Sequence, residues 1–125
     1  MPKKASILVV DDEDSALQLL QEALTAAGYD VFAASDGAEA WKALQTGAVK
    51  DIALLLTDLV MPRMDGMELA RKVTAAYPGV KILFISGYAD EIVYDHQDIA
   101  GVSAFLPKPF DVVGLQKRVK EIIGR

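Results

Sequence analysis

Short apolar runs, each ending at a polar or turn residue, constrain the fold of this chain more than any other feature. Four of them occupy residues 5–10, 52–56, 80–85 and 103–106, and a short apolar segment at residues 31–34 follows a Gly-Tyr-Asp turn. Runs of this kind are typical of strands buried on both faces, as in a parallel sheet. The sequence therefore predicts five strands, with the segment at 31–34 near an edge.

Segments with helical periodicity separate these strands. The first begins at Glu13-Asp14, and an Asp followed three residues later by Glu resembles a capping box at Asp36 and again at Asp65. Asp111 opens the last predicted helix, and a less regular apolar stripe at residues 90–100 predicts another helix before the fifth strand. Strands alternating with helices through right-handed crossovers predict an α/β fold with a doubly wound sheet.

Length and charge narrow the class of protein further. A chain of 125 residues, 52% hydrophobic and 25% charged, has the make-up of one globular domain spanning residues 1–125. A net charge of −5 disfavours direct binding to the nucleic-acid backbone, and the apolar runs are too short to span a bilayer. The chain has no cysteine, which fits a reducing cytoplasm. We therefore expect a cytoplasmic protein with no contact to nucleic acid or membrane.

Polar residues follow most of the predicted strands directly. Asp11-Asp12-Glu13-Asp14 follow the first strand, Asp58 the third, Ser86-Gly87 the fourth and Pro107-Lys108-Pro109 the fifth. In an open parallel sheet, the loops at the carboxyl ends of the strands meet at the point where the strand order reverses. We expect these side chains to share one edge of the sheet.

The acidic residues at this edge predict a cation site. Taken alone, Asp11-Asp12-Glu13-Asp14 are explained more simply as acids that favour a helix N-terminus. Asp58 changes the interpretation, because two carboxylates about 4 Å apart repel by roughly 4 kcal/mol at an effective dielectric of 20. Oxygen ligands without a neighbouring His or Cys favour Mg²⁺ as the compensating ion.

Two further side chains complete a site suited to phosphoryl transfer. Lys108 has the ordinary interpretation of a surface lysine, but it lies between two prolines directly after a buried strand, within reach of the acids. Ser86 equally fits a simple turn residue, although at this rim its hydroxyl can donate to a phosphoryl oxygen. A carboxylate nucleophile, a cation, an ammonium and a hydroxyl suit phosphoryl transfer. His96, the sole histidine, is predicted to lie on the surface.

Together these residues resemble the receiver domains of bacterial response regulators, over essentially the whole chain. The resemblance rests on Asp11-Asp12, Asp58, Pro62 with Met64-Asp65-Gly66, Ser86 and Lys108-Pro109-Phe110. It implies a flavodoxin-like receiver fold with strand order 2-1-3-4-5, a Mg²⁺ cofactor and a role in two-component phosphorelay signalling.

By this resemblance, Asp58 accepts a phosphoryl group from the phosphohistidine of a sensor histidine kinase or of a phosphotransfer protein. Asp12 is then a direct Mg²⁺ ligand and Asp11 acts largely through water. The Asp58 carboxylate and the Val60 carbonyl are further ligands, and Lys108 contacts the phosphoryl group. The peptide bond between Lys108 and Pro109 is expected to be cis, an isomer that proline makes accessible.

The resemblance also names residues that switch and tune such a domain. Ser86 and Phe105 take the switch positions, which implies binding of a downstream protein on the face of the fourth helix, fifth strand and fifth helix. Val60 and Tyr88 take positions that tune self-dephosphorylation. Neither is a good base, so we expect slow loss of the phosphoryl group. The domain is then a phosphoacceptor that assists its own phosphorylation and is not a conventional enzyme.

Two positions depart from the pattern of similar proteins. Arg63 stands where the loop after the acceptor often has Gly, which predicts a local change of backbone geometry. Phe105 lacks a hydroxyl, so a switch here cannot use a tyrosine hydrogen bond. The chain ends soon after the last predicted helix, so we expect output by contact, whether the domain is free-standing or part of a hybrid kinase or larger regulator.

Other functions fit the sequence less well. A phosphohydrolase of the haloacid dehalogenase type places its nucleophile after the first strand, with an acid/base Asp two residues on, whereas Val60 is two residues beyond Asp58. A nucleotide-binding Rossmann domain needs a glycine fingerprint in the first turn, which is acidic here. The remaining alternative is a phosphorylation-independent interaction module, against which the intact site residues argue.

Overall fold

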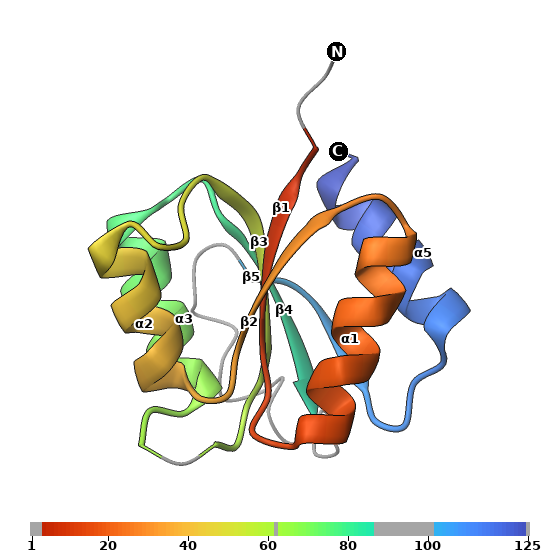
Figure 1. Ribbon diagram of the computed structural model, residues 1–125, viewed down its shortest axis with the longest axis horizontal. Helices are drawn as coiled ribbons and strands as arrows, with labels where there is room; N and C mark the ends of the chain where they lie inside the picture. Colours follow the sequence, from red (N-terminus) through yellow and green to blue (C-terminus); the bar gives the residue numbers. More distant parts are fainter. Residues whose placement is uncertain (1–3, 62, 87–101, 125) are drawn as a thin grey trace.

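A five-stranded parallel sheet forms the centre of the protein, in a computed structural model that describes residues 4–61, 63–86 and 102–124 (Figure 1). The strands are β1 (Ser6–Val10), β2 (Asp30–Ala34), β3 (Ile52–Asp58), β4 (Lys81–Ser86) and β5 (Val102–Pro107). Their spatial order is β2-β1-β3-β4-β5, and every neighbouring pair is parallel. The predicted fold class and strand order are confirmed.

Helices cover both faces of this sheet. They are α1 (Asp14–Ala26), α2 (Gly37–Thr46), α3 (Gly66–Ala76) and α5 (Val112–Ile123). Helices α1 and α5 lie on one face, and α2 and α3 on the other (Figure 1). The helix predicted at residues 90–100, with His96, lies outside the described residues. Among the helices of the described ranges, none could span a bilayer.

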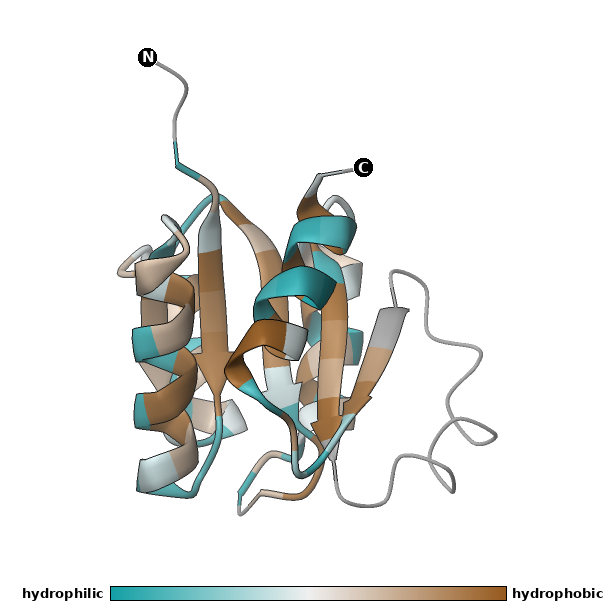
Figure 2. Cartoon of the chain, turned by 90° about the vertical axis from the view of Figure 1, so that its right-hand side faces the viewer, coloured by the Kyte–Doolittle hydropathy of each residue, from teal (hydrophilic) through white to brown (hydrophobic). Residues whose placement is uncertain are grey.

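The strands supply both halves of the core, as the brown strands between the helices show (Figure 2). Successive side chains of a strand point to opposite faces of a sheet. Accordingly Leu8 and Val10 of β1 pack toward α2 and α3, whereas Ile7 and Val9 pack toward α1 and α5. All four are fully buried, which explains why the strand has no polar residue in this stretch.

The predicted helix starts are confirmed by their capping bonds. The carboxylates of Asp36, Asp65 and Asp111 each accept a hydrogen bond from the backbone N–H three residues further on, over 2.8, 2.8 and 2.6 Å. Such side chains satisfy backbone donors that have no partner within the helix. Glycines in the left-handed conformation follow α1 and α2, Gly28 at φ 99° and Gly47 at φ 82°.

Strand β3 is longer than predicted, and its extra length matters for the site. The apolar run stops at Leu56, but Thr57 pairs with Val10 of β1 and Asp58 pairs with Ile85 of β4. The pairing continues because both neighbouring strands reach this level. Asp58 is therefore the last residue of a central strand, with its backbone fixed by the sheet.

The predicted apolar stripes of the helices run slightly too far at their ends. The helical period of the sequence places Ala27 and Ala76 on the apolar faces, but both are exposed at the C-terminal ends of α1 and α3. The same period places Val112, Leu115 and Val119 on the apolar face of α5. Val112 is 36% exposed, while Leu115 and Val119 are buried. The first and last turns extend past the area that the sheet covers.

Candidate functional site

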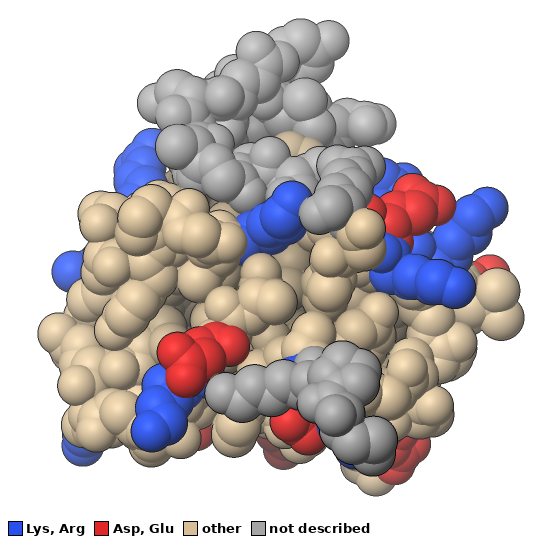
Figure 3. Space-filling model, turned by 90° about the horizontal axis from the view of Figure 1, so that it is seen from above, with Lys and Arg blue, Asp and Glu red and all other residues tan. Residues whose placement is uncertain are grey.

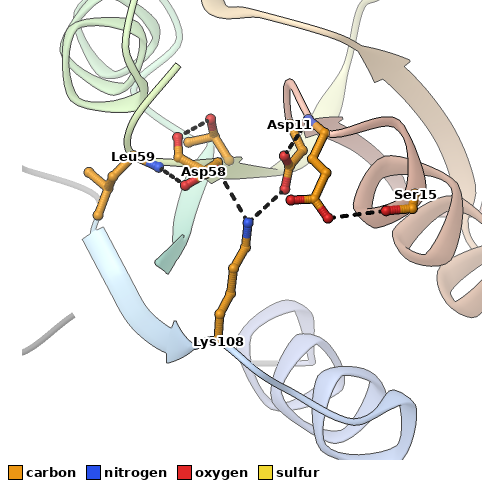
Figure 4. Close-up of polar contacts among 7 residues, drawn as sticks. Asp11, Ser15, Asp58, Leu59 and Lys108 are labelled. Atoms are coloured by element: carbon orange, nitrogen blue, oxygen red, sulfur yellow. Dashed lines mark hydrogen bonds and ion pairs between the residues drawn. The ribbon is translucent and has the colours of Figure 1, made fainter. Parts of the chain in front are cut away.

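Three strands bring four of the predicted site residues to one edge of the sheet. Asp11 and Asp12 follow β1, Asp58 ends β3, and Lys108 follows β5. Because β1 and β3 are hydrogen-bonded neighbours, Asp11 and Asp58 leave the sheet side by side. Lys108 reaches them from the far side of β4, where β5 ends (Figure 4).

The three aspartates form a compact carboxylate cluster. One oxygen of each of Asp11, Asp12 and Asp58 lies within 4.8 Å of the others. Asp11 is buried, Asp58 is partly buried and Asp12 is exposed, so the cluster opens from the core to solvent. In the described part of the chain no other three acidic, His or Cys side chains converge in this way.

Lys108 lies between two of these acids. Its Nζ is 3.2 Å from Oδ2 of Asp11 and 3.2 Å from Oδ2 of Asp58 (Figure 4). The Lys108 side chain is 27% exposed, so these contacts are only partly screened by water. The Lys108-Pro109 peptide bond is cis, as expected. One ammonium thus partly neutralises three carboxylates, and an excess of negative charge remains.

Asp58 is held by its own backbone surroundings as well as by Lys108. Its Oδ1 accepts a hydrogen bond from the Leu59 N–H over 2.7 Å, which leaves Oδ2 facing Lys108 (Figure 4). The Thr57 hydroxyl donates to the Asp58 carbonyl oxygen over 2.8 Å. Gly66, at the start of α3, packs so closely that a Cβ there would lie 2.0 Å from the same carbonyl oxygen. A side chain at position 66 would therefore displace the acceptor.

Burial and charge shift two pKa values at this edge. Burial raises the pKa of Asp11, and the hydrogen bond from Glu13 N–H and the Lys108 ammonium offset the rise only in part. Burial acts to lower the pKa of Lys108, but the charges of Asp58 and Asp11 outweigh it, so that this pKa lies above its ordinary value. Lys108 is consequently a fixed cation, and ionised Asp11 is held at an energetic cost.

The structure describes the remaining predicted site residues to different extents. Val60 is two residues beyond Asp58 and 66% exposed. Phe105 in β5 is half-buried, with its ring centroid 5.4 Å from that of Phe84 in β4. Ser86 ends β4, and its side chain lies outside the described part of the structure, as does all of Tyr88. Their predicted roles in switching and dephosphorylation stay predictions.

A contact between Arg63 and Asp36 was not expected from the sequence. Arg63 Nε lies 2.9 Å from Asp36 Oδ2, and Nη2 contacts the same oxygen. The pair joins the loop after Asp58 to the start of α2. The only sequence signal was that Arg63 replaces a common Gly, and the structure gives it φ 66°, in the left-handed region that glycine adopts readily. Asp36 had been identified only as a helix cap.

The donor set of the cluster fits a hard divalent cation. Carboxylate oxygens are the ligands that Mg²⁺ and Ca²⁺ prefer, and a cation would relieve the repulsion among the three acids. The opposite end of the molecule differs: the acidic groups visible there lie apart from one another among uncharged atoms and basic side chains (Figure 3). We conclude that the carboxyl edge of the sheet can bind a metal ion.

Comparison with protein families gives one match over most of the chain. Residues 7–120 match the model of the response regulator receiver domain. The chain is 38% identical over 117 residues to the response regulator receiver protein CpdR of Brucella abortus, covering 94% of this chain and 95% of that protein. It is also 37% identical over 122 residues to the sensor kinase CckA of the same organism, covering 97% of this chain and 13% of the kinase.

Solved structures agree with the sequence comparisons. A CheY-like response regulator receiver domain protein from Methanospirillum hungatei superposes with a TM-score of 0.88 at 29% identity, covering 98% of this chain and 95% of that one. The matched relatives thus include both a protein of nearly the same length and a much longer kinase that contains a similar segment.

Proposed function

Because this chain belongs to the response regulator receiver domain family of two-component signalling systems, we propose that Asp58 accepts a phosphoryl group from a phosphohistidine and that the acyl phosphate switches partner binding. The observation that carries the proposal is Lys108 Nζ, 3.2 Å from the carboxylates of both Asp11 and Asp58 in a cluster of three acids. This arrangement provides a nucleophile and a fixed positive charge at the same point.

In the proposed reaction, a carboxylate oxygen of Asp58 attacks the phosphorus of the donor. The bond from phosphorus to the donor imidazole nitrogen breaks, and the nitrogen keeps the electron pair. The Leu59 N–H donates to Oδ1. Lys108 lies beside Oδ2 and can contact the phosphoryl oxygens as negative charge develops on them. Phosphoryl transfer needs mainly positioning and charge neutralisation, which these groups supply.

The ion we propose for the cluster is Mg²⁺. Asp12 and Asp58 would bind it directly, with the Val60 carbonyl as a further ligand and Asp11 acting largely through water. When bound, it would neutralise charge on the phosphoryl oxygens and balance the carboxylates. Asp12, exposed at the mouth of the cluster, suits a ligand that meets the ion from solution.

The phosphodonor we propose is a sensor histidine kinase or a phosphotransfer protein in the cytoplasm. A groove of about 470 Å³ runs beside Lys108, between the start of α1 and the loop before α5. Ala16, Leu19 and Phe110 line it, and Leu19 is 39% exposed. An apolar surface next to the acceptor suits a protein donor that must bring its phosphohistidine within bonding distance of Asp58.

We propose that the output signal passes through the edge strand β5, which carries Phe105. Its ring packs against Phe84 across the β4–β5 pair, so a movement of Ser86 toward the phosphoryl group can be accompanied by a change at Phe105. The predicted surface for a downstream protein includes β5 and α5. Beryllofluoride, an acyl-phosphate mimic, should shift amide NMR signals there. Shifts confined to the surroundings of Trp41 in α2 would contradict this route.

Intact-mass spectrometry tests the central claim. With Mg²⁺ and acetyl phosphate, the parent should gain one phosphoryl group, and chelation of the metal should prevent the gain. Asp58→Asn should stay unlabelled, whereas labelling of that variant at another residue would show that the acceptor is assigned wrongly. A parent that binds its partner with full affinity but never gains mass would favour the phosphorylation-independent interaction module.

A further inference from the structure

We infer that Arg63 is a positioning residue for the loop that follows the acceptor, acting through its ion pair with the helix-capping carboxylate of Asp36. The inference rests on the proposed function, because the loop begins at Leu59 and Val60, next to the phosphorylated and metal-binding carboxylates. It assigns a role to a residue that departs from the pattern of similar proteins.

The loop between β3 and α3 is already fixed at its base. The Gly66 N–H donates to the Leu59 carbonyl over 2.9 Å, which closes the loop on itself. Leu59 and Met61 are 5% and 8% exposed and pack into the core beneath α2 and α3. Val60, between them, is 66% exposed and has no comparable packing. The base is held by the core, and a second attachment is needed to fix the outer part.

That second attachment is made to the first turn of α2. Arg63 donates from Nε and Nη2 to Oδ2 of Asp36, while Oδ1 of Asp36 accepts from the Glu39 N–H at 2.8 Å. The two carboxylate oxygens therefore serve different partners. Asp36 is 8% exposed, and its pKa is lowered because the Glu39 N–H and the Arg63 guanidinium together outweigh the effect of burial. Close backbone packing adds to the contact, since a Cβ on Gly37 would lie 2.2 Å from the Met64 carbonyl oxygen.

The backbone conformation at position 63 indicates that arginine is present there for the contact that its side chain makes. Its φ of 66° lies in the region where a side chain is unfavourable and glycine is preferred. A residue that breaks a local rule needs a compensating contact elsewhere. The two donors to Asp36 are that contact, and glycine could not make it.

The consequence is a loop held at its base by the core and at its outer part by the first turn of α2. Helices α2 and α3 lie together on that face (Figure 1), and the pair connects the start of one to the segment before the other. Release of Arg63 should therefore let the backbone between Leu59 and Arg63 move relative to the carboxylate cluster. Residues that orient ligands in this way commonly change metal affinity without touching the metal.

The sign of the effect in Arg63→Ala separates positioning from plain electrostatics, whereas Asp36→Asn tests whether the same contact is responsible. Arg63→Ala removes a positive charge from the loop that follows the acceptor, which by charge alone would tighten Mg²⁺ binding. Asp36→Asn removes a negative charge, which alone would weaken it. Asparagine also remains a good helix cap, so this variant keeps the bond to Glu39 while its amide N–H₂ group opposes the Arg63 donors. Positioning predicts weaker binding in both variants.

The experiment is an NMR titration of each variant with Mg²⁺ at physiological salt, following the Leu59 amide, alongside thermal unfolding. We expect Arg63→Ala and Asp36→Asn each to weaken binding roughly three- to tenfold, at or below the low end for residues that orient metal ligands. The double variant should be no worse than either single one, because both act through one contact. Arg63→Lys should recover part of the affinity. Arg71→Ala, which removes an exposed arginine of α3, serves as the matched control and should bind like the parent.

Each other outcome has a defined meaning. Tighter binding by Arg63→Ala, or lowered unfolding temperature with unchanged Mg²⁺ affinity, would overturn the positioning role while the function of Asp58 stands. Multiplicative losses in the double variant would overturn it as well, since the two residues would then act separately. If the parent itself neither binds Mg²⁺ nor gains a phosphoryl group, the proposed function fails, and the inference fails with it.

Discussion

The two ends of the sheet solve different physical problems. At the amino ends of β3 and β4, a cavity of about 530 Å³ is lined by apolar residues of the α2 and α3 ends, with Lys50 and Asp51 at its margin. At the carboxyl ends, three carboxylates converge and two of them contact one ammonium. The amino end has a mostly apolar cavity, whereas the carboxyl end has unbalanced charge. Unbalanced charge is the better sign of function here, because it has a cost that a fold tolerates only for a ligand or a reaction.

Packing at the amino end shows the contrast in detail. Tyr77 packs edge-on against Trp41, with ring centroids 6.5 Å apart, and its hydroxyl lies 3.4 Å from the Leu44 carbonyl oxygen. Lys72 lies over the Trp41 ring, with its Nζ 5.6 Å from the ring centroid. The polar and charged groups in these contacts thus have partners within the protein. At the carboxyl end the pKa of Asp11 is raised, which means that the folded protein opposes its ionisation.

The largest difference between the two ends should come from removing a lysine at each. Lys108→Met should slow labelling by acetyl phosphate roughly 100-fold, the usual size of losing one donor to a developing charge. Lys50→Met, at the amino end, should leave the rate unchanged. The labelling rates of both variants are measured by intact-mass spectrometry of samples quenched at successive times. Equal rates for the two variants would remove the main functional distinction between the ends.

The second prediction concerns the lifetime of the acyl phosphate. The exposed side chain of Val60 cannot orient water, and Tyr88 is bulky, so the parent should lose its phosphoryl group slowly. Asn at Val60 together with Glu at Tyr88 should speed the loss by roughly tenfold, below the full range of general acid–base effects. The decay is followed by intact mass after removal of the donor. An unchanged half-life would contradict water exclusion but leave the acceptor assignment intact.

The third prediction concerns the free energy of unfolding without metal, which should be lowered by the ionised carboxylate of Asp11. Burial raises the pKa of Asp11 above the ordinary value of an aspartate, so the native state holds this proton more tightly than the unfolded chain does. The corresponding stability is complete below that value and is lost as the pH rises through the folded pKa. In chelator at pH 7, Asp11→Asn should therefore unfold at a higher denaturant concentration than the parent. Its free energy of unfolding should be higher by roughly 1 kcal/mol.

Addition of Mg²⁺ supplies the control for that measurement. The ion should stabilise the parent by mass action and the Asp11→Asn variant less, which would reduce or reverse their order. A variant that is less stable than the parent in chelator would show that Asp11 contributes more through its ion pair with Lys108 than burial of its charge costs, because asparagine can still accept the Glu13 N–H.

The smallest effect is expected at the cavity end. Tyr77→Phe removes a hydroxyl whose contact with the Leu44 carbonyl is long and partly exposed, so unfolding should change by less than about 1 kcal/mol. Labelling at Asp58 should not change. A clear loss of labelling would mean that the two ends are coupled through α2 and α3, and the contrast between them would need revision.

The sequence by itself determined the fold class, because buried parallel strands require continuous apolar runs and crossover helices require a 3.6-residue period. It also predicted the edge at which Asp11, Asp58 and Lys108 would lie, since strand ends in such a sheet share one side. Each of these inferences depends on local pattern plus one rule of topology. Extension of β3 to Asp58 was missed because Thr57 and Asp58 are polar, and only their neighbours' backbone determines that pairing.

Only the tertiary structure decided how the loop after the acceptor is held. Arg63 and Asp36 are 27 positions apart, and no periodicity links a helix cap to a loop on another strand. Gly66 belongs to the motif that carries the family resemblance, but the physical reason for a glycine there appears only from the Asp58 carbonyl that lies against it. Contacts of this kind depend on the distance between two backbones, which packing sets and local sequence does not encode.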